Sequence, residues 1–331
     1  MYHDTQHAIP VPACCAADIA TIALIQNRRL LLHGPSGAGK STLAAHLAQA
    51  LGSAGQRCHC ICADPGSPAF GLPGAIALAR WQTDSWQVYA YEALCSLDAA
   101  RFRLPLVLAV ARLAQLAPDE PLLIDTPGVT RGVAGCELLQ GLFEASAADA
   151  VLALTLTNQP PALLSELQSL TTRLFIVRAS PEARRPGKRS RARQRTRLWA
   201  DFLGHGREQI TNLERTPIVG TPPPLGEASA WIGRQVALLD RNQTGTLAEV
   251  TNLQHHRLTV RLPAPLQTFD SLLIRDAQRS SNGLLETAAP FAAEPLTYRT
   301  LPGLHESPRQ NSGTAQRSFV ALPPASRPDK V

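Results

Sequence analysis

The chain has 331 residues and a formal net charge of +6, and 44% of its residues are hydrophobic. This suffices for one or two domains with a buried core, and no apolar run approaches the roughly 20 residues that a membrane span needs. The first residues carry neither a basic region nor an apolar stretch, so no secretory signal is expected. Seven cysteines suit a reducing compartment better than a disulfide framework at this length, which favours a cytoplasmic protein.

The first strong signal is a glycine-rich turn between a short apolar run and a helical pattern. Residues 30–33 are typical of a buried strand, and residues 41–51 predict a helix that ends at Gly52. Between them, residues 34–41 read Gly-Pro-Ser-Gly-Ala-Gly-Lys-Ser, which fits the G-x-x-x-x-G-K-[ST] phosphate loop. The motif and its context predict that the chain binds a nucleoside triphosphate.

The chemistry of this loop assigns roles to its residues. Glycines allow backbone N–H groups to approach phosphate closely, and the helix N-terminus adds a positive dipole end. Lys40 is one of only three lysines in the chain, and its ammonium is expected to reach the β- and γ-phosphates. Ser41 is the expected hydroxyl ligand of Mg²⁺. The nucleotide-binding residues expected in this segment are Gly34, Pro35, Ser36, Gly37, Ala38, Gly39, Lys40, Ser41 and Thr42.

Beyond the phosphate loop, predicted strands alternate with predicted helices. Strands are expected over 57–63, 121–125, 150–156 and 174–177, and helices over 99–117 and 163–170. This alternation predicts an α/β fold of the P-loop NTPase type, with a mostly parallel sheet covered by helices on both faces. Cys58, Cys60 and Cys62 alternate along the first of these strands, which leaves open a thiolate metal site or, more commonly, small side chains that fill a packed face.

Two carboxylates, Asp64 and Asp125, end predicted strands at the edge of the sheet that carries the phosphate loop. In open α/β sheets, ligands bind at that edge. One carboxylate is expected to orient Mg²⁺ or its water, and the other to accept a proton from an attacking hydroxyl; a turn or capping role is the alternative for each. The turn at 125–128 also fits a GTPase switch, but the chain lacks the guanine-reading Asn-Lys-x-Asp, which disfavours a GTPase.

Positive charge is concentrated in residues 178–197. This stretch holds eight arginines and Lys188 against a single acidic residue, Glu182. It follows the last predicted strand, where a nucleotide kinase places a mobile lid whose arginines stabilise charge on the γ-phosphate and exclude water. The same arginines suit a nucleic-acid backbone, and a solvated basic linker is the remaining alternative. A helix is expected over 198–202.

After Gly204 the pattern changes to short strands. Four prolines at 217 and 222–224 mark a linker, strands are expected over 236–240, 245–250 and 257–261, and residues 240–245 are expected to form a hairpin loop. The predicted organisation is a lead-in over 1–27, a P-loop kinase domain over 28–204 with an arginine-rich lid at 180–197, a linker and small β-rich domain over 205–289, and a disordered tail over 290–331.

The order of these motifs resembles the polynucleotide 5′-hydroxyl kinases, the P-loop family that includes the RNA kinase subunit of the eukaryotic pre-mRNA cleavage machinery. The chain looks like a bacterial-type member. Residues 62–67 resemble the family's Asp-x-Asp-x-Gly-Gln stretch, 70–75 its Gly-Pro-Gly-like turn, 126–128 its Thr-x-Gly clasp and 184–197 its lid arginines. The resemblance extends over residues 28–205 and, more weakly, over 228–285.

This resemblance implies an ATP- and Mg²⁺-dependent kinase that phosphorylates the 5′-hydroxyl of RNA or DNA. It implies Asp64 as the general base, Asp125 with Ser41 at the metal, and Thr126 and Gly128 as a clamp on the nucleotide or the acceptor end. The catalytic residues expected are Lys40, Asp64, Arg184, Arg185, Arg189 and Arg193. No motif for a protein partner is visible.

Three positions depart from the family pattern. Cys62 replaces the first acid, Ser67 the glutamine, and Val129 stands where many members have a large aromatic residue. The loss of the first acid shifts metal coordination towards Asp125. These departures keep two alternatives open: a nucleotide-gated nucleic-acid-binding or scaffold ATPase without kinase activity, and a kinase or ligase of a small metabolite on the same fold.

Overall fold

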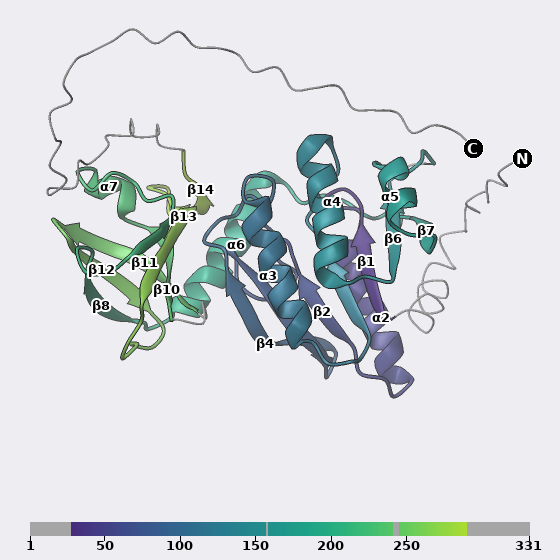
Figure 1. Cartoon of the computed structure of the whole chain (residues 1–331), viewed down its shortest axis with the longest axis horizontal. Helices are drawn as coiled ribbons and strands as arrows, with labels where there is room; N and C mark the ends of the chain where they lie inside the picture. Colours follow the sequence, from purple (N-terminus) through teal and green to yellow (C-terminus); the bar gives the residue numbers. More distant parts are fainter. Residues whose placement is uncertain (1–27, 157, 241–244, 290–331) are drawn as a thin grey trace, which may run out of the picture. The chain divides into compact units, whose positions relative to one another are not determined.

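The computed structural model describes residues 28–156, 158–240 and 245–289. The predicted lead-in, the tail and most of the predicted hairpin loop lie outside these residues. Among the described residues, seven strands form a first sheet in the order β4-β3-β2-β5-β1-β6-β7 (Figure 1). They are β1 (Arg29–His33), β2 (His59–Cys62), β3 (Ala75–Gln82), β4 (Ser85–Ala93), β5 (Leu122–Asp125), β6 (Ala150–Thr155) and β7 (Leu174–Arg178).

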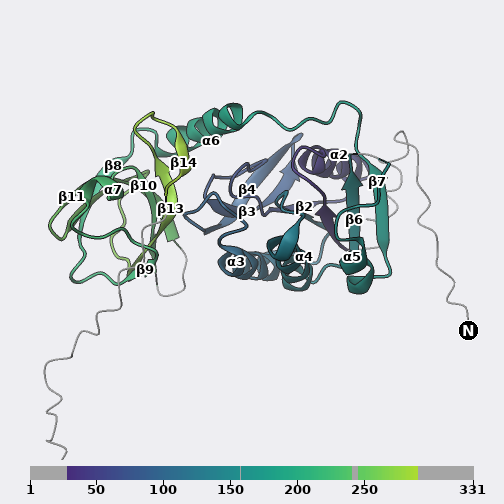
Figure 2. The ribbon, with the colours of Figure 1, turned by 90° about the horizontal axis from the view of Figure 1, so that it is seen from above.

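The centre of this sheet is parallel and buried on both faces. Strand β1 lies between β5 and β6, with Leu31 in register with Ile124 and Val151. Side chains alternate across the sheet, so Leu30 and Leu31 enter two different cores. Figure 2 shows α2 (Lys40–Ser53) on one face and α3 (Arg103–Leu116), α4 (Gly132–Ser146) and α5 (Leu164–Leu170) on the other. The predicted α/β fold with helices on both faces is therefore confirmed.

Several boundaries differ from the sequence predictions. Helix α2 continues through Gly52 to Ser53, because the following residue, Ala54, closes the helix with its backbone N–H group. The hairpin of β3 and β4 was not predicted, and it adds an antiparallel edge to the sheet. Helix α4 was also not predicted. The helix expected over 198–202 is in fact α6 (Lys188–Leu203), which includes most of the arginine segment.

A second, mostly antiparallel sheet follows α6, in the order β14-β13-β10-β11-β12-β8, with β9 paired to β13. Its elements are β8 (Arg207–Asn212), β9 (Ile218–Gly220), α7 (Ala228–Trp231), β10 (Arg234–Leu239), β11 (Gly245–Gln254), β12 (Arg257–Leu262), β13 (Ser271–Arg279) and β14 (Leu285–Thr287). The predicted small β-rich region is present, and β9 lies inside the segment expected to be a linker. No helix of the described residues is long and apolar enough to cross a membrane.

Candidate active site

The phosphate loop follows β1, and its backbone is shaped for close approach. Gly37 has a φ of 85°, and a Cβ built there would lie 2.6 Å from Cα of Arg185 in the lid segment. Only glycine fits that position. The ammonium of Lys40 is buried and donates hydrogen bonds to the carbonyl oxygens of Gly34 (2.8 Å) and Pro35 (3.2 Å). Burial lowers the pKa of Lys40, and the charges of Asp125 and Asp64 oppose this effect.

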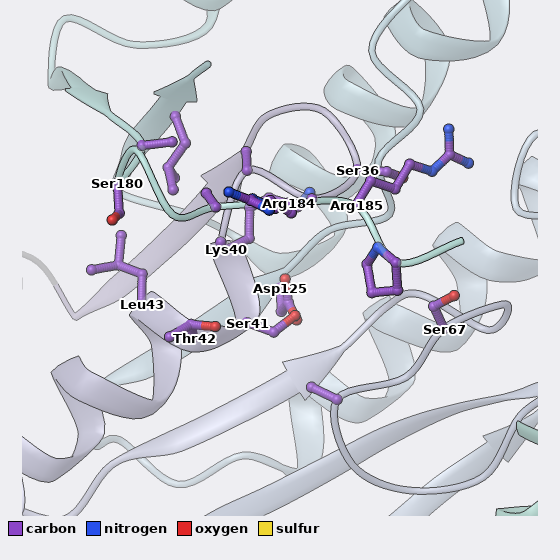
Figure 3. A pocket seen from close by; sticks show the side chains of 18 of the residues that line it. Ser36, Lys40, Ser41, Thr42, Leu43, Ser67, Asp125, Ser180, Arg184 and Arg185 are labelled. Carbon is purple, nitrogen blue, oxygen red and sulfur yellow. The ribbon is translucent and has the colours of Figure 1, made fainter. Parts of the chain in front are cut away.

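Ser41 and Asp125 form the predicted hydroxyl–carboxylate pair. The Ser41 hydroxyl donates a hydrogen bond of 2.6 Å to Oδ2 of Asp125, and Figure 3 shows the two side chains next to each other beneath Lys40. Asp125 is the last residue of β5, and burial raises its pKa to about 6, against the lowering effects of Lys40 and Ser41. Two oxygen ligands, Ser41 at the start of α2 and Asp125 at the end of β5, suit a hard cation such as Mg²⁺.

The predicted clasp residues lie beside the loop in two different ways. Thr126 lines the pocket, but its hydroxyl donates a hydrogen bond of 2.7 Å to the carbonyl of Leu32 in β1. A Cβ on Gly128 would lie 2.2 Å from Oγ of Ser36, so the clasp turn packs directly on the phosphate loop. The clasp therefore supports the loop in this structure.

Asp64 follows β2 and faces the same pocket. Its Oδ1 accepts hydrogen bonds from the backbone N–H groups of Gly66 (3.0 Å) and Ser67 (3.1 Å). These bonds fix one carboxylate oxygen through a tight turn, as aspartates in turns often do. Asp64 is half-buried, unlike Asp125, which is almost fully buried. The two carboxylates thus occupy distinct environments at one edge of the sheet.

The lid segment lies over the phosphate loop. Arg184 and Arg185 both line the pocket. Figure 3 shows Arg184 beside Lys40, whereas the guanidinium of Arg185 points away from Asp125. The backbone of Arg185 makes the close approach to Gly37 described above. The lid therefore covers the loop mainly with its main chain.

Helix α6 presents two different faces. Arg191 and Gln194 line the pocket, although the sequence reasoning had not selected them, whereas Arg189 and Arg193 are exposed and are not among the lining residues. The Nε atom of Arg191 is buried without a hydrogen-bond partner, so it is available to an anionic ligand. Arg191 lies next to the buried face of α6, which Ala192 and Trp199 define.

A single pocket of about 860 Å³ is lined by Lys40, Ser41, Asp64, Asp125, Thr126, Arg184, Arg185, Arg191 and Gln194, among others. Leu43 and Ser180 lie at one end and Ser67 at the other, with Lys40 and Asp125 between them (Figure 3). Asp64 is at the Ser67 end, because it is hydrogen-bonded to that residue's N–H group. A chain of phosphates held at the loop would therefore have one carboxylate, Asp125, beneath it and a second, Asp64, at the far end.

The cysteine strand does not form a metal site. Cys58 and Cys60 pack in the core between the sheet and α2, and burial raises the pKa of Cys58 to about 12. No cluster of three or more His, Cys, Asp or Glu side chains suitable for a metal occurs in the described part of the chain. Of the two interpretations, the packed face is the one that the structure supports.

Comparisons with known proteins give a consistent picture. Residues 34–95 match the family model of the mRNA cleavage and polyadenylation factor CLP1 P-loop. A polyribonucleotide 5′-hydroxyl-kinase of Pyrococcus horikoshii is 27% identical over 199 residues, which are 58% of this chain and 54% of the relative. The counterpart from Pyrococcus abyssi is 26% identical over 212 residues, 62% of this chain and 59% of the relative. The chain thus spans less than two thirds of the length of these relatives.

Two solved structures resemble the fold. A chain of a Clp1p–Pcf11p complex matches with a TM-score of 0.63 at 14% identity, over 82% of this chain and 80% of that chain. A second structure with the same two proteins gives a TM-score of 0.65 at 15% identity, over 82% and 81%. The P-loop fold and the resemblance to the polynucleotide 5′-hydroxyl-kinase family, both predicted from the motifs, are confirmed.

Proposed function

We propose that this chain is an ATP-dependent polynucleotide 5′-hydroxyl kinase, which transfers the γ-phosphate of ATP to the 5′-hydroxyl of RNA or DNA. The observation that carries the proposal is the pocket with a phosphate loop in the middle and Asp64 at one end. A kinase needs these two parts, a phosphate cradle and a separate base for the acceptor. The names of the two Pyrococcus relatives point to the same reaction.

The residues present fit ATP and Mg²⁺. Ser41 and Asp125 offer oxygen ligands for the metal, while Lys40 and the loop amides hold the phosphates. Lys40 reaches them by exchanging its bonds to the loop carbonyls for bonds to phosphate oxygens. When bound, ATP with Mg²⁺ supplies the phosphoryl group and part of the charge that offsets its oxygens. Leu43 and Ser180 mark the end of the pocket that we assign to the adenine ring of ATP.

The protein's own groups then do three things. Asp64 accepts the proton of the 5′-hydroxyl, since its carboxylate faces the pocket and one oxygen is held by the turn. Arg184, Arg185 and Arg191 stabilise negative charge and exclude water. Arg189 and Arg193, on the outer face of α6, contact the polynucleotide beyond its 5′ end.

The five cysteines free of disulfides among the described residues support a cytoplasmic location.

The test is phosphate transfer from γ-labelled ATP to matched RNA and DNA oligonucleotides with 5′-hydroxyl ends, in the presence of Mg²⁺. We expect label on at least one oligonucleotide, none with Lys40→Ala, and a rate about 10²- to 10⁴-fold lower with Asp64→Asn, because this is the usual contribution of a general base. ATP binding should survive in Asp64→Asn. Near-normal turnover of this variant would refute Asp64 as the base. ATP binding by the wild type without any labelled acceptor would favour the scaffold alternative.

A further inference from the structure

One buried amide connects the second sheet to the acceptor end of the pocket. Gln235 lies on β10, is 0% exposed, and donates a hydrogen bond of 3.0 Å from Nε2 to the carbonyl of Pro73 in the first sheet's 63–74 loop. Its Oε1 lies against the next residue, where a Cβ on Gly74 would be only 2.0 Å away. The side chain of Gln235 therefore sets the position of the Pro73–Gly74 turn.

A hydrogen bond links the Pro73–Gly74 turn to Pro65, the residue that follows Asp64. The N–H of Gly74 donates a hydrogen bond of 3.0 Å to the carbonyl of Pro65, and its own carbonyl accepts bonds from Leu94 and Cys95. Gly74 has a φ of 77°, which side chains with a Cβ rarely adopt. A displacement of this turn therefore acts directly on the hydrogen bond between Gly74 and Pro65.

Pro65 begins the turn that orients the Asp64 carboxylate. The N–H groups of Gly66 and Ser67 are the donors to its Oδ1. Gly66 packs closely against the chain at Leu97, since a Cβ there would lie 2.5 Å from the carbonyl oxygen of Leu97. Gln235 is thus connected to Asp64 by a continuous series of hydrogen bonds and close contacts through Pro73, Gly74, Pro65 and Gly66.

Only one of the two polar atoms of the Gln235 amide, Nε2, has a hydrogen-bond partner. Its Oε1 has no hydrogen-bond partner although it is buried. A buried polar atom without a partner costs free energy of folding, so an apolar side chain of the same length would fill this space at least as well. The hydrogen bond to Pro73 is what an apolar side chain cannot supply.

We infer that Gln235 is a positioning residue of the proposed kinase reaction: the second sheet, through the Gln235–Pro73 hydrogen bond, holds Asp64 in the orientation needed to receive the acceptor's proton. The inference rests on the proposed function. Gln235 touches neither nucleotide nor acceptor and acts through the loop. The second sheet is thereby part of the catalytic apparatus and not an appended module.

The decisive variant is Gln235→Met, which keeps the length of the side chain and removes the hydrogen bond. The matched control is Gln278→Met, because Nε2 of Gln278 donates to the carbonyls of Ala230 and Ile232 within the second sheet's own region. We expect Gln235→Met to lower kcat about tenfold or more, as small misplacements of reacting groups do. ATP affinity and the melting temperature should stay close to those of the control. Gln235→Asn, one methylene too short to reach Pro73, serves if the first variant does not fold.

Two further readouts separate positioning from a general structural defect. In the Asp64→Asn background, Gln235→Met should change the residual rate less than twofold, because its effect passes through Asp64. Amide hydrogen exchange of the 64–74 loop should accelerate in Gln235→Met and not in Gln278→Met, whether or not the protein is a kinase. Equal kcat for the two variants, or an undiminished effect in the Asp64→Asn background, would overturn the inference. A wild type without kinase activity but with the exchange difference would overturn the proposed function and leave the loop coupling in place.

Discussion

Burial sets the chemistry of Asp125. This carboxylate is almost fully buried, and its pKa is raised to about 6 even though Lys40 and the Ser41 hydroxyl favour the charged form. Between about pH 4 and 6 the folded protein therefore keeps a proton that the unfolded chain has released. The free energy of unfolding falls as the pH rises through this window. At neutral pH the buried Asp125 carboxylate is charged, and this lowers the free energy of unfolding of the ligand-free protein. The same charge suits Asp125 to bind a metal ion.

Asp125→Asn should therefore stabilise the ligand-free protein while it abolishes Mg²⁺-dependent activity. We expect the free energy of unfolding to rise by at most about 3 kcal/mol at neutral pH, since one pKa unit corresponds to about 1.4 kcal/mol, and the gain to vanish near pH 4. Urea titrations at pH 7 and near pH 4 measure this difference in the free energy of unfolding. Asp119→Asn is the control, because that side chain is 79% exposed. A less stable Asp125→Asn at neutral pH would mean that attraction to Lys40 outweighs burial.

Among the elements, helix α6 places its arginines in different environments. Ala192, Trp199 and Leu203 form its buried stripe, and Arg191 lies beside that stripe at the pocket. Arg193 is exposed, and Arg197 pairs with Asp201 at 3.7 Å on the surface. Arg195 is half-buried and donates a hydrogen bond of 2.6 Å to the carbonyl of Leu285 on β14. The basic segment is thus neither a uniform lid nor a simple linker, because its arginines face the pocket, the second sheet or solvent.

This division predicts unequal effects of two similar substitutions. Arg191→Ala should lower kcat/KM for the acceptor about 10- to 100-fold, because hydrogen bonds to charged groups contribute about 1.5–3 kcal/mol. Arg193→Ala should cost at most about threefold near 200 mM salt and more near 50 mM, since exposed phosphate contacts are screened. Kinase assays at both salt concentrations compare the two variants. A larger loss for Arg193→Ala at high salt would reverse the assignment of the two faces.

The same elements explain what could be predicted from the sequence. Strands β1, β5 and β6 are buried on both faces, so continuous apolar runs marked them, and the phosphate loop carried its own motif. The β3–β4 hairpin escaped prediction because its turn uses Thr83 and Asp84, both with positive φ, without the usual glycine.

Helix α4 was missed for a different reason. It contains glycines, which have low helix propensity, and tertiary packing overrides that preference. A Cβ on Gly141 would lie 2.8 Å from the Val107 side chain of α3, so the glycine allows the two helices to approach closely. Arg191 lies in the predicted lid segment 184–197 but was not singled out as a site residue, because helical periodicity is hard to recognise in a run of arginines. Its role became visible only once Trp199 fixed which side of α6 is buried.

At the scale of the whole molecule, the two sheets share a hydrophobic core. Its buried members come from the first sheet and its loops, from α6 and from the second sheet: Ala75, Cys95, Trp199, Leu203, Ala237, Leu239, Leu247, Leu273 and Leu285. Trp199 is fully buried, and its indole N–H donates a hydrogen bond of 2.6 Å to Glu249 on β11. Glu249 also accepts a bond of 3.1 Å from Arg279. The helix that bears the pocket residue Arg191 is thus held by the second sheet.

A shared core predicts cooperative unfolding of both sheets. Scanning calorimetry of the full chain should give one transition whose calorimetric and van't Hoff enthalpies agree. Glu249→Ala should lower the stability by about 1–3 kcal/mol, because it leaves the Trp199 N–H and Arg279 without their acceptor, and the single transition should move as a whole. Glu214→Ala removes an exposed carboxylate 3.7 Å from His256. This control should leave the free energy of unfolding unchanged within about 0.5 kcal/mol. Two resolved transitions, with only one of them moved by Glu249→Ala, would show that the sheets unfold independently and that α6 is anchored to just one of them.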